Sequence, residues 1–267
     1  MQLIIPAFNE EGRLPATLRA LRAYALSTAA LPRPPLEVLV VDNASTDRTA
    51  EVARALDSPA MPVRVLRCDV RGKGAAVRAG MLATTSDVIG FMDADCATDL
   101  TAFERTTVLL AGGADVVIGS RSAEGAQTEN RHSALRTVGA AVYRRATAAL
   151  VPGVGDTQCG FKIMRGDLGR AIFADCRTRG FSFDVEMLAR ARALGARIEE
   201  FPVVWSDVPG STFSPVRHGL RSFAELVSIQ VRLARRVAPT TRVTPLHKPA
   251  AASVVAPDVR WNVAGGA

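Results

Sequence analysis

The chain has 267 residues, of which 48% are hydrophobic and 22% charged, an ordinary composition for a packed globular protein. Its net charge of +7 would by itself fit a nucleic acid, an anionic membrane or a phosphorylated substrate, but the low aromatic content of 5% argues against the base-stacking surface of a nucleic-acid binder. The four cysteines form no Cys-x-x-Cys pair, so we expect neither a zinc site nor a disulfide framework, but reduced thiols in a cytoplasm.

The N-terminal residues MQLIIPAFNEEGR predict a strand, because they lack the basic leader of a signal peptide and their apolar stretch is short. Nowhere does an uninterrupted apolar run approach the ~20 residues that span a bilayer. We therefore expect a cytoplasmic protein that meets a membrane only peripherally.

Five short apolar runs alternate with helix-like segments over the first 120 residues. The runs are rich in Val and Ile and lack period-two alternation, which is typical of strands that are covered on both faces. They cover residues 2–7, 37–42, 63–68, 87–95 and 115–121, and the segments of helical length between them are 11–29, 47–56, 73–84 and 101–110. This order predicts an α/β fold with a doubly wound, mostly parallel sheet flanked by helices.

Polar residues follow all five runs. They read FNEE after the first run, DNASTD after the second, RGKG soon after the third, DAD at the end of the fourth and GSR at the end of the fifth. Ligands of doubly wound sheets bind beyond the carboxyl ends of the strands. We therefore expect the chemistry of this protein at that edge of the sheet.

The second half of the chain predicts three further helices and two strands. Helices are expected over 131–150 and from 183 to a C-cap at Gly195, and strands after the Gly- and Pro-rich loop that begins at 151 and over 196–205. Residues 216–238 predict a basic amphipathic helix, which fits either an anionic membrane surface or a packed core. Its apolar positions, spaced by three or four residues, are Leu220, Phe223, Val227 and Val231. Residues 239–267, rich in Pro, Ala and Gly, predict a flexible tail outside a single domain of residues 1–238.

Asp93 and Asp95 end the fourth run, separated by one alanine. On an extended chain their side chains point to the same side, and two carboxylates so placed repel each other unless a cation lies nearby. Mg²⁺ with phosphate oxygens completing its coordination is one solution. For an isolated pair, capping of a turn or of the helix predicted from residue 101 is the commoner role.

Asp42 and Lys73 are further candidates for binding. Asp42 lies directly at a strand end, where it can accept hydrogen bonds from a base or ribose, whereas Asp47 can also cap the following helix. Glycines on both sides of Lys73 let backbone N–H groups and an ammonium approach an anion. The spacing of a GxxxxGK[ST] loop and a GxGxxG fingerprint are both missing, which disfavours a P-loop kinase and a dinucleotide-binding dehydrogenase.

Taken together, the motifs IIPAFNEE, VLVVDNASTD, RGKGAAVRAG, DVIGFMDADCATD and VVIGSR resemble glycosyltransferase family 2, the inverting enzymes of the GT-A fold, across about the first 125 residues. Further on, DTQCGFKIM and FSFDVEMLARARALG resemble the subgroup that transfers a sugar to a polyprenyl phosphate, especially dolichyl-phosphate glucosyltransferases. The resemblance extends to about residue 212.

This resemblance implies a donor half over residues 1–125 and an acceptor half over 126–215. The implied donor-binding residues are Pro6, Ala7, Phe8, Asn9, Glu10, Asp42, Lys73, Asp93, Ala94 and Asp95. The implied metal ligands for Mg²⁺ or Mn²⁺ are Asp95 and, second to it, Asp93, and both count with Asp156 as catalytic. The acceptor-binding residues are Arg121, Arg131, Gln158 and Asp184. The chain departs from the family pattern at Asn43, where a second acidic residue is common.

The reaction implied is a metal-dependent, inverting transfer of a hexose from a nucleotide sugar, with UDP-glucose favoured, to a polyprenyl or dolichyl phosphate. Because a phosphate monoester is largely dianionic at neutral pH, Asp156 is expected to position the acceptor rather than deprotonate it. The alternatives are a GDP-mannose-dependent polyprenyl-phosphate mannose synthase and a transferase with a soluble acceptor. We expect an anionic membrane surface as a partner and no nucleic acid, and the sequence carries no signal for an oligomeric state.

Overall fold

The computed structural model describes residues 1–28, 35–129, 143, 145–206 and 215–234, with the side chains of the last helix described from residue 222 onward. The predicted tail at 239–267 and most of the helix predicted over 131–150 lie outside this part of the chain. None of the described helices is long and apolar enough to cross a membrane.

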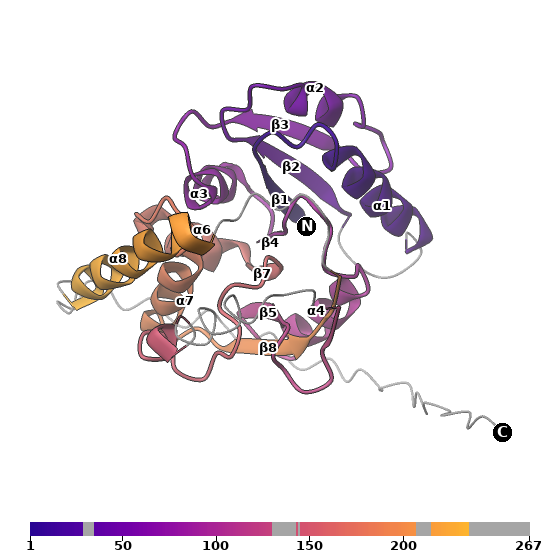
Figure 1. The fold of residues 1–267 in the computed structure, drawn as a ribbon. Coiled ribbons are helices and arrows are strands. Elements are labelled where there is room, and N and C mark those ends of the chain that lie inside the picture. The colour runs from indigo at the N-terminus through magenta and orange to yellow at the C-terminus, as the bar shows by residue number, and fades with distance from the viewer. Residues whose placement is uncertain (29–34, 130–142, 144, 207–214, 235–267) are drawn as a thin grey trace. The chain divides into compact units, whose positions relative to one another are not determined.

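A seven-stranded sheet forms the centre of the protein (Figure 1). Its strand order is β3-β2-β1-β4-β7-β5-β8, and all neighbours are parallel except β7, which runs antiparallel between β4 and β5. The strands are β1 Gln2–Ala7, β2 Glu37–Asp42, β3 Val63–Arg67, β4 Val88–Phe91, β5 Val116–Ser120, β7 Lys162–Arg165 and β8 Ile198–Pro202. A separate parallel pair joins β6 Gln127–Glu129 to β9 Val204–Ser206.

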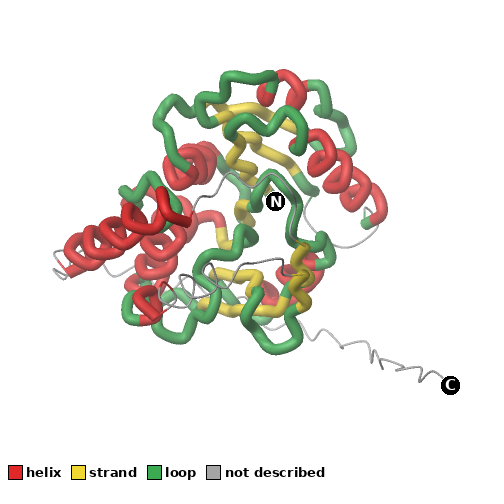
Figure 2. The backbone as a smooth tube through the Cα atoms, viewed as in Figure 1, coloured by secondary structure: helices red, strands yellow, loops and turns green. Residues whose placement is uncertain are grey.

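Helices cover both faces of this sheet, as the side chains of its strands require. Along β1, Leu3 and Ile5 belong to one buried cluster and Ile4 to the other, so the strand alternates between two apolar layers. The first layer lies under α1 Leu14–Ser27, α2 Thr49–Arg54 and α4 Ala102–Ala111. The second lies under α3 Lys73–Ala83, α6 Gly166–Asp175, α7 Phe183–Ala193 and α8 Pro215–Ala234. Figure 2 shows the strands between these two sets of helices.

The predicted doubly wound, mostly parallel sheet is confirmed, with two differences in its strands. The run over 87–95 is extended only to Phe91, so Asp93 and Asp95 lie in the following turn. The strand predicted over 196–205 divides at Val203, and its second part pairs with β6 outside the main sheet. At the second break the apolar pattern of the sequence continues through Val203, so the change of partner strand there is decided by tertiary pairing.

Helix α8 is apolar on two sides. Leu226 and Ile229 are buried against the second layer, so this side of the helix packs into the core. Three of the residues predicted as its apolar face, Phe223, Val227 and Val231, are instead 37%, 62% and 42% exposed. The side chain of Leu220 lies outside the described part of the chain. Of the two packing modes open from the sequence, core packing therefore holds for one side of the helix. The second side stays partly exposed, with the Phe223 ring 5.8 Å from the ring of Tyr143.

We expect Gly80→Val to lower the free energy of unfolding by about 1–3 kcal/mol, because overpacking of a well-filled core costs about that much. A β-carbon at Gly80 in α3 would lie 2.6 Å from Ile4 and 2.9 Å from Val41, so the helix must move away from β1 and β2. Urea denaturation measures the change. Gly12→Val is the matched control, since a β-carbon there meets nothing within 4 Å, and equal stability of the two variants would contradict the packing argument.

Candidate active site

Backbone strain gathers at the carboxyl ends of three neighbouring strands. Among the described residues other than glycine, positive φ angles occur at Asn9 (56°), Ala44 (58°) and Cys96 (54°). Asn9 follows β1, Ala44 follows β2 and Cys96 follows β4. Such a conformation costs of order 1 kcal/mol or more and persists only where the surroundings enforce it, and it tends to cluster at functional sites. The strain therefore marks the same edge of the sheet as the polar motifs.

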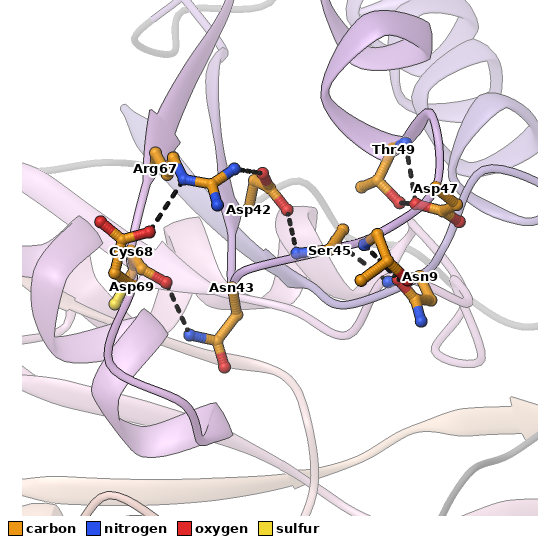
Figure 3. Close-up of polar contacts among 10 residues, drawn as sticks. Asn9, Asp42, Asn43, Ser45, Asp47, Thr49, Arg67, Cys68 and Asp69 are labelled. Atoms are coloured by element: carbon orange, nitrogen blue, oxygen red, sulfur yellow. Dashed lines mark hydrogen bonds and ion pairs between the residues drawn. The ribbon is translucent and has the colours of Figure 1, made fainter.

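Side chains from the DNASTD segment hold the loops after β1 and β2 together (Figure 3). The backbone N–H of Asn9 donates to Ser45 Oγ at 3.0 Å, and Asn9 Oδ1 accepts from the N–H of Thr46 at 2.9 Å. Asp47 accepts from the N–H of Glu11 at 3.1 Å and from the first backbone N–H of α2 at 3.0 Å. Asp47 therefore joins the two loops and also caps α2, the structural role that its sequence position allowed.

Asp42, the last residue of β2, is 3% exposed beside an exposed guanidinium. Its Oδ1 accepts from the N–H of Ser45 at 3.0 Å, and its Oδ2 lies 3.5 Å from Arg67, which also pairs with Asp69 at 2.8 Å (Figure 3). The strand register places Asp42 next to Ala7. A carboxylate at this position can accept hydrogen bonds from the N–H groups of a base or the hydroxyls of a ribose.

Asn43 fixes the loop that leads to Lys73. Its Nδ2 donates to the carbonyl oxygens of Cys68 at 3.1 Å and Val70 at 2.7 Å, and its Oδ1 accepts from the N–H of Gly72 at 2.8 Å. An amide can donate and accept in this way, whereas a carboxylate cannot donate. The departure from the family pattern at Asn43 thus has a structural explanation, which sequence reasoning missed.

Asp93 and Asp95 come together in a turn and not along an extended strand. Asp93 Oδ1 forms an ion pair with Lys73 Nζ at 2.6 Å, and Asp95 Oδ1 accepts from the N–H of Ala97 at 3.2 Å. Burial, together with the charge of Asp93, raises the pKa of Asp95 above its usual value. Neither residue caps α4, since Asp99 accepts from the N–H of Thr101 at 2.9 Å at the start of that helix.

The Asp93–Asp95 pair suits a hard divalent cation. Carboxylate oxygens are the ligands that Mg²⁺ and Mn²⁺ prefer, and a cation would relieve the repulsion between the two groups. Within the described ranges, no cluster of three or more His, Cys, Asp or Glu side chains could hold a metal alone. The coordination would therefore need oxygens from a ligand. A small recess lined by Asp93, Asp95, Gly160 and Trp205, among others, lies at this point.

Arg121 and Asp156 form a two-pronged ion pair after β5. Arg121 Nε and Nη2 donate to Asp156 at 2.7 and 2.9 Å, and the guanidinium carbon lies 5.6 Å from the centre of the Trp205 ring. The carboxylate of Glu200 accepts from the N–H groups of Gly155 at 2.7 Å and Asp156 at 2.9 Å, which holds the loop in place. Burial favours a raised pKa for Asp156, but the hydrogen bonds and charge of Arg121 outweigh it and hold that pKa below its usual value.

Asp184 and Lys162 form a second ion pair, beneath the surface. The side chains are 4% and 0% exposed, and Lys162 Nζ donates to Asp184 Oδ1 at 2.6 Å. Gln158 Nε2 donates to the carbonyl of Phe181 at 3.3 Å, next to this pair. Asp184 Oδ1 is therefore occupied by Lys162 below the surface, and the acceptor contact expected of Asp184 from the sequence stays a prediction.

The remaining expected residues lie around the same edge or outside the described ranges. Pro6 and Ala7 end β1, Phe8 is 43% exposed, and Glu10 pairs with Arg13 at 2.6 Å. Ala94 is buried, and its carbonyl accepts from Thr17 at 2.6 Å. Arg131 lies outside the described part of the chain. Sequence reasoning missed Lys162 and Glu200; a lysine inside the apolar run of β7 was the available signal for the former.

Comparison with known proteins identifies the family of the chain. Residues 2–173 match the family model described as glycosyl transferase family 2. A dolichyl-phosphate beta-glucosyltransferase from Drosophila melanogaster is 34% identical over 247 residues, 87% of this chain and 74% of its own. A protein of the same name from Homo sapiens is 29% identical over 244 residues, 87% of this chain and 75% of its own.

Solved structures match the fold at lower sequence identity. Glucosyl-3-phosphoglycerate synthase from Mycobacterium tuberculosis, in complex with Mn²⁺, UDP-glucose and phosphoglyceric acid, gives a TM-score of 0.61 at 20% identity, covering 85% of this chain and 78% of that one. The same enzyme with Mg²⁺ and UDP gives 0.60 at 20% identity, with the same coverage. The expected GT-A fold is confirmed.

We expect Asn43→Asp to lower the free energy of unfolding at neutral pH by about 1–3 kcal/mol, because a carboxylate would face the carbonyls of Cys68 and Val70 with no proton to donate. Asn9→Asp is the matched control, since Asn9 Oδ1 acts as an acceptor from Thr46 and a carboxylate keeps that function. Urea denaturation of both variants tests this. A larger loss at Asn9 than at Asn43 would show that the loop does not depend on the amide donor.

The depressed pKa of Asp156 predicts a pH-dependent contribution to stability. The ion pair with Arg121 should contribute fully above the unfolded-state pKa of about 3.9 and lose its effect as the pH falls through the lower pKa of the folded state. Relative to wild type, Asp156→Asn should therefore be less stable at pH 6–7, with a difference that shrinks below about pH 4. Urea denaturation at a series of pH values measures this difference, and a pH-independent difference would refute the ionic contribution.

Proposed function

The chain belongs to glycosyl transferase family 2, and from this premise we propose that it transfers glucose from UDP-glucose to a polyprenyl or dolichyl phosphate with inversion at the anomeric carbon. It is a glycosyltransferase. The observation that carries the choice of substrate is the similarity, over 87% of the chain, to proteins named dolichyl-phosphate beta-glucosyltransferase. That similarity favours glucose over the GDP-mannose alternative and a lipid phosphate over a soluble acceptor.

Residues 1–125 form the donor half in this proposal. Asp42 accepts hydrogen bonds from the base or ribose, and the loop of Pro6, Ala7, Phe8, Asn9 and Glu10 lies along the nucleotide. Asp95 and Asp93 would hold Mg²⁺ or Mn²⁺, which when bound supplies positive charge to the leaving diphosphate. Lys73 adds a second positive charge beside Asp93. Ala94 lies between the two aspartates, and its carbonyl accepts from Thr17 Oγ1, which ties the turn to α1.

Residues 126–215, with Arg121 at their border, form the acceptor half. Arg121 attracts the phosphate of the lipid. Asp156 holds the guanidinium of Arg121 in place, and Glu200 in turn holds the 155–156 loop that carries Asp156. A phosphate oxygen attacks the anomeric carbon from the face opposite the diphosphate, the new C–O bond forms as the old one breaks, and the nucleoside diphosphate leaves. Since the attacking phosphate is largely dianionic, Asp156 can remain bonded to Arg121 throughout. Arg131 and Gln158 belong to this half as further acceptor-binding residues.

The lipid acceptor places the enzyme at a membrane, and we assign it to the cytoplasmic face as a peripheral protein. The exposed side chains of Phe223, Val227 and Val231 on α8 offer an apolar surface of the kind that enters a lipid interface. The basic residues of the same segment suit anionic lipids.

The test is transfer to polyprenyl phosphate in anionic lipid vesicles, with UDP-glucose and GDP-mannose offered separately with Mg²⁺ or Mn²⁺. We expect glucosyl lipid as the product from UDP-glucose, and enzyme that floats with the vesicles. For Asp95→Asn we expect kcat/KM to fall by about 10²-fold or more, the order expected when a group that stabilises developing charge is removed. Asp99→Asn is the matched control, because Asp99 lies in the same loop and accepts from the N–H of Thr101 just before α4. Mannosyl lipid as the main product, or full activity of Asp95→Asn, would overturn the substrate or the metal assignment respectively.

A further inference from the structure

We propose that the buried Lys162–Asp184 ion pair is a positioning device for Asp93, holding its carboxylate in place from beneath through Gly160 and Lys73. The inference rests on the proposed function only in taking Asp93 as part of the donor site. It assigns to Asp184 and Lys162 a role other than contact with either substrate.

The first connection runs through the backbone. Lys162 Nζ donates to the carbonyl oxygen of Cys159 at 2.5 Å as well as to Asp184 at 2.6 Å. This hydrogen bond fixes the peptide that leads into Gly160. A β-carbon built on Gly160 would lie 2.2 Å from Asp93 Oδ2, so the carboxylate of Asp93 rests directly against this glycine. Moving the 159–160 peptide therefore moves the surface that supports Asp93.

The second connection is electrostatic. Lys73 Nζ lies 2.6 Å from Asp93 Oδ1, and its ammonium also interacts with the charge of Asp184, which raises the pKa of Lys73 together with Asp93 against the effect of burial. From the core outward, the charges of Lys162, Asp184, Lys73 and Asp93 alternate in sign. The two inner groups, Asp184 and Lys73, thus each interact with two opposite charges, and the ammonium of Lys73 is kept beside Asp93.

The strand that leads into the Asp93 turn contacts the same pair. Lys162 Nζ lies 5.2 Å from the centre of the Phe91 ring, and Phe91 is the last residue of β4, two residues before Asp93. The register of the sheet pairs Phe91 with Lys162. The pair is therefore in contact with β4, with the 159–160 peptide and, through charge, with Lys73.

Stability alone does not account for a buried pair at this position. Replacing a buried ion pair by well-packed apolar residues is often neutral or stabilising, whereas removing one partner leaves an uncompensated charge. The double variant Lys162→Met/Asp184→Leu therefore separates a positioning role from a structural one. It removes the charges and the Cys159 hydrogen bond while leaving an apolar filling, and Asp184→Asn alone provides the destabilised comparison.

The experiment measures the binding of UDP, and separately of GDP, by calorimetry with and without Mn²⁺. The readout is the factor by which Mn²⁺ tightens nucleotide binding, and urea denaturation is recorded in parallel. We expect the double variant to recover the stability that Asp184→Asn loses and to bind nucleotide without Mn²⁺ as wild type does. The factor by which Mn²⁺ tightens nucleotide binding should fall about tenfold or more, the size typical of groups that orient metal ligands. A double variant that keeps the Mn²⁺ factor would overturn the inference.

Gly160→Ala provides an independent route should the double variant not fold. Its added methyl group displaces Asp93 without touching the ion pair, and it should lower the Mn²⁺ factor by a similar amount. Gly112→Ala at the end of α4, where the nearest atoms lie at 3.4 Å, is the control and should leave the factor unchanged. If Mn²⁺ does not tighten the binding of either nucleotide to the wild-type protein, the donor site itself is refuted. If Mn²⁺ tightens binding equally in wild type, Gly160→Ala and the double variant, only the positioning role is refuted.

Discussion

Two carboxylates, those of Asp93 and Asp95, lie within one turn after β4, and each destabilises the charge of the other. The surrounding structure offsets this repulsion unequally. Lys73 forms an ion pair with Asp93 at 2.6 Å, whereas Asp95 has a backbone N–H as a hydrogen-bond partner at 3.2 Å and is also stabilised by the charges of Lys73 and Arg13. A site so arranged favours a further positive charge. The divalent cation proposed above would supply that charge.

Most of the polar side chains around this edge hold backbone groups and do not face a substrate. Asn43 holds the 68–72 loop, Asp47 holds the loop after β1, and Glu200 holds the 155–156 loop. Hydrogen bonds from side chains to the backbone fix these loops without secondary structure. Asp42 is presented from the end of β2, Asp93, Asp95 and Arg121 follow the ends of β4 and β5, and Lys162 and Asp184 extend the same arrangement into the core.

Sequence patterns could predict the parallel strands of the sheet, but not the position and direction of β7 within it. Runs of Val and Ile predicted β1 to β5 because strands covered on both faces must be apolar throughout, and the motif after each run followed from the common direction of parallel strands. The insertion of β7 between β4 and β5 in the opposite direction is a long-range pairing that no local pattern encodes. That insertion brings Gly160 and Lys162 next to the Asp93 turn.

The amino-acid sequence by itself determined which groups are available: the aspartates, the lysine between two glycines, the arginine after β5, and the apolar runs that place them at one edge. Only the tertiary structure decided what each group does. Asp47 and Asn43 hold loops by hydrogen bonds to the backbone, and Asp184 is buried in an ion pair with Lys162. On α8, Leu226 and Ile229 are buried in the core, whereas Phe223 is exposed. The physical reason is that a side chain's partners, and hence its charge environment, come from residues far away in the chain, which local spacing does not specify.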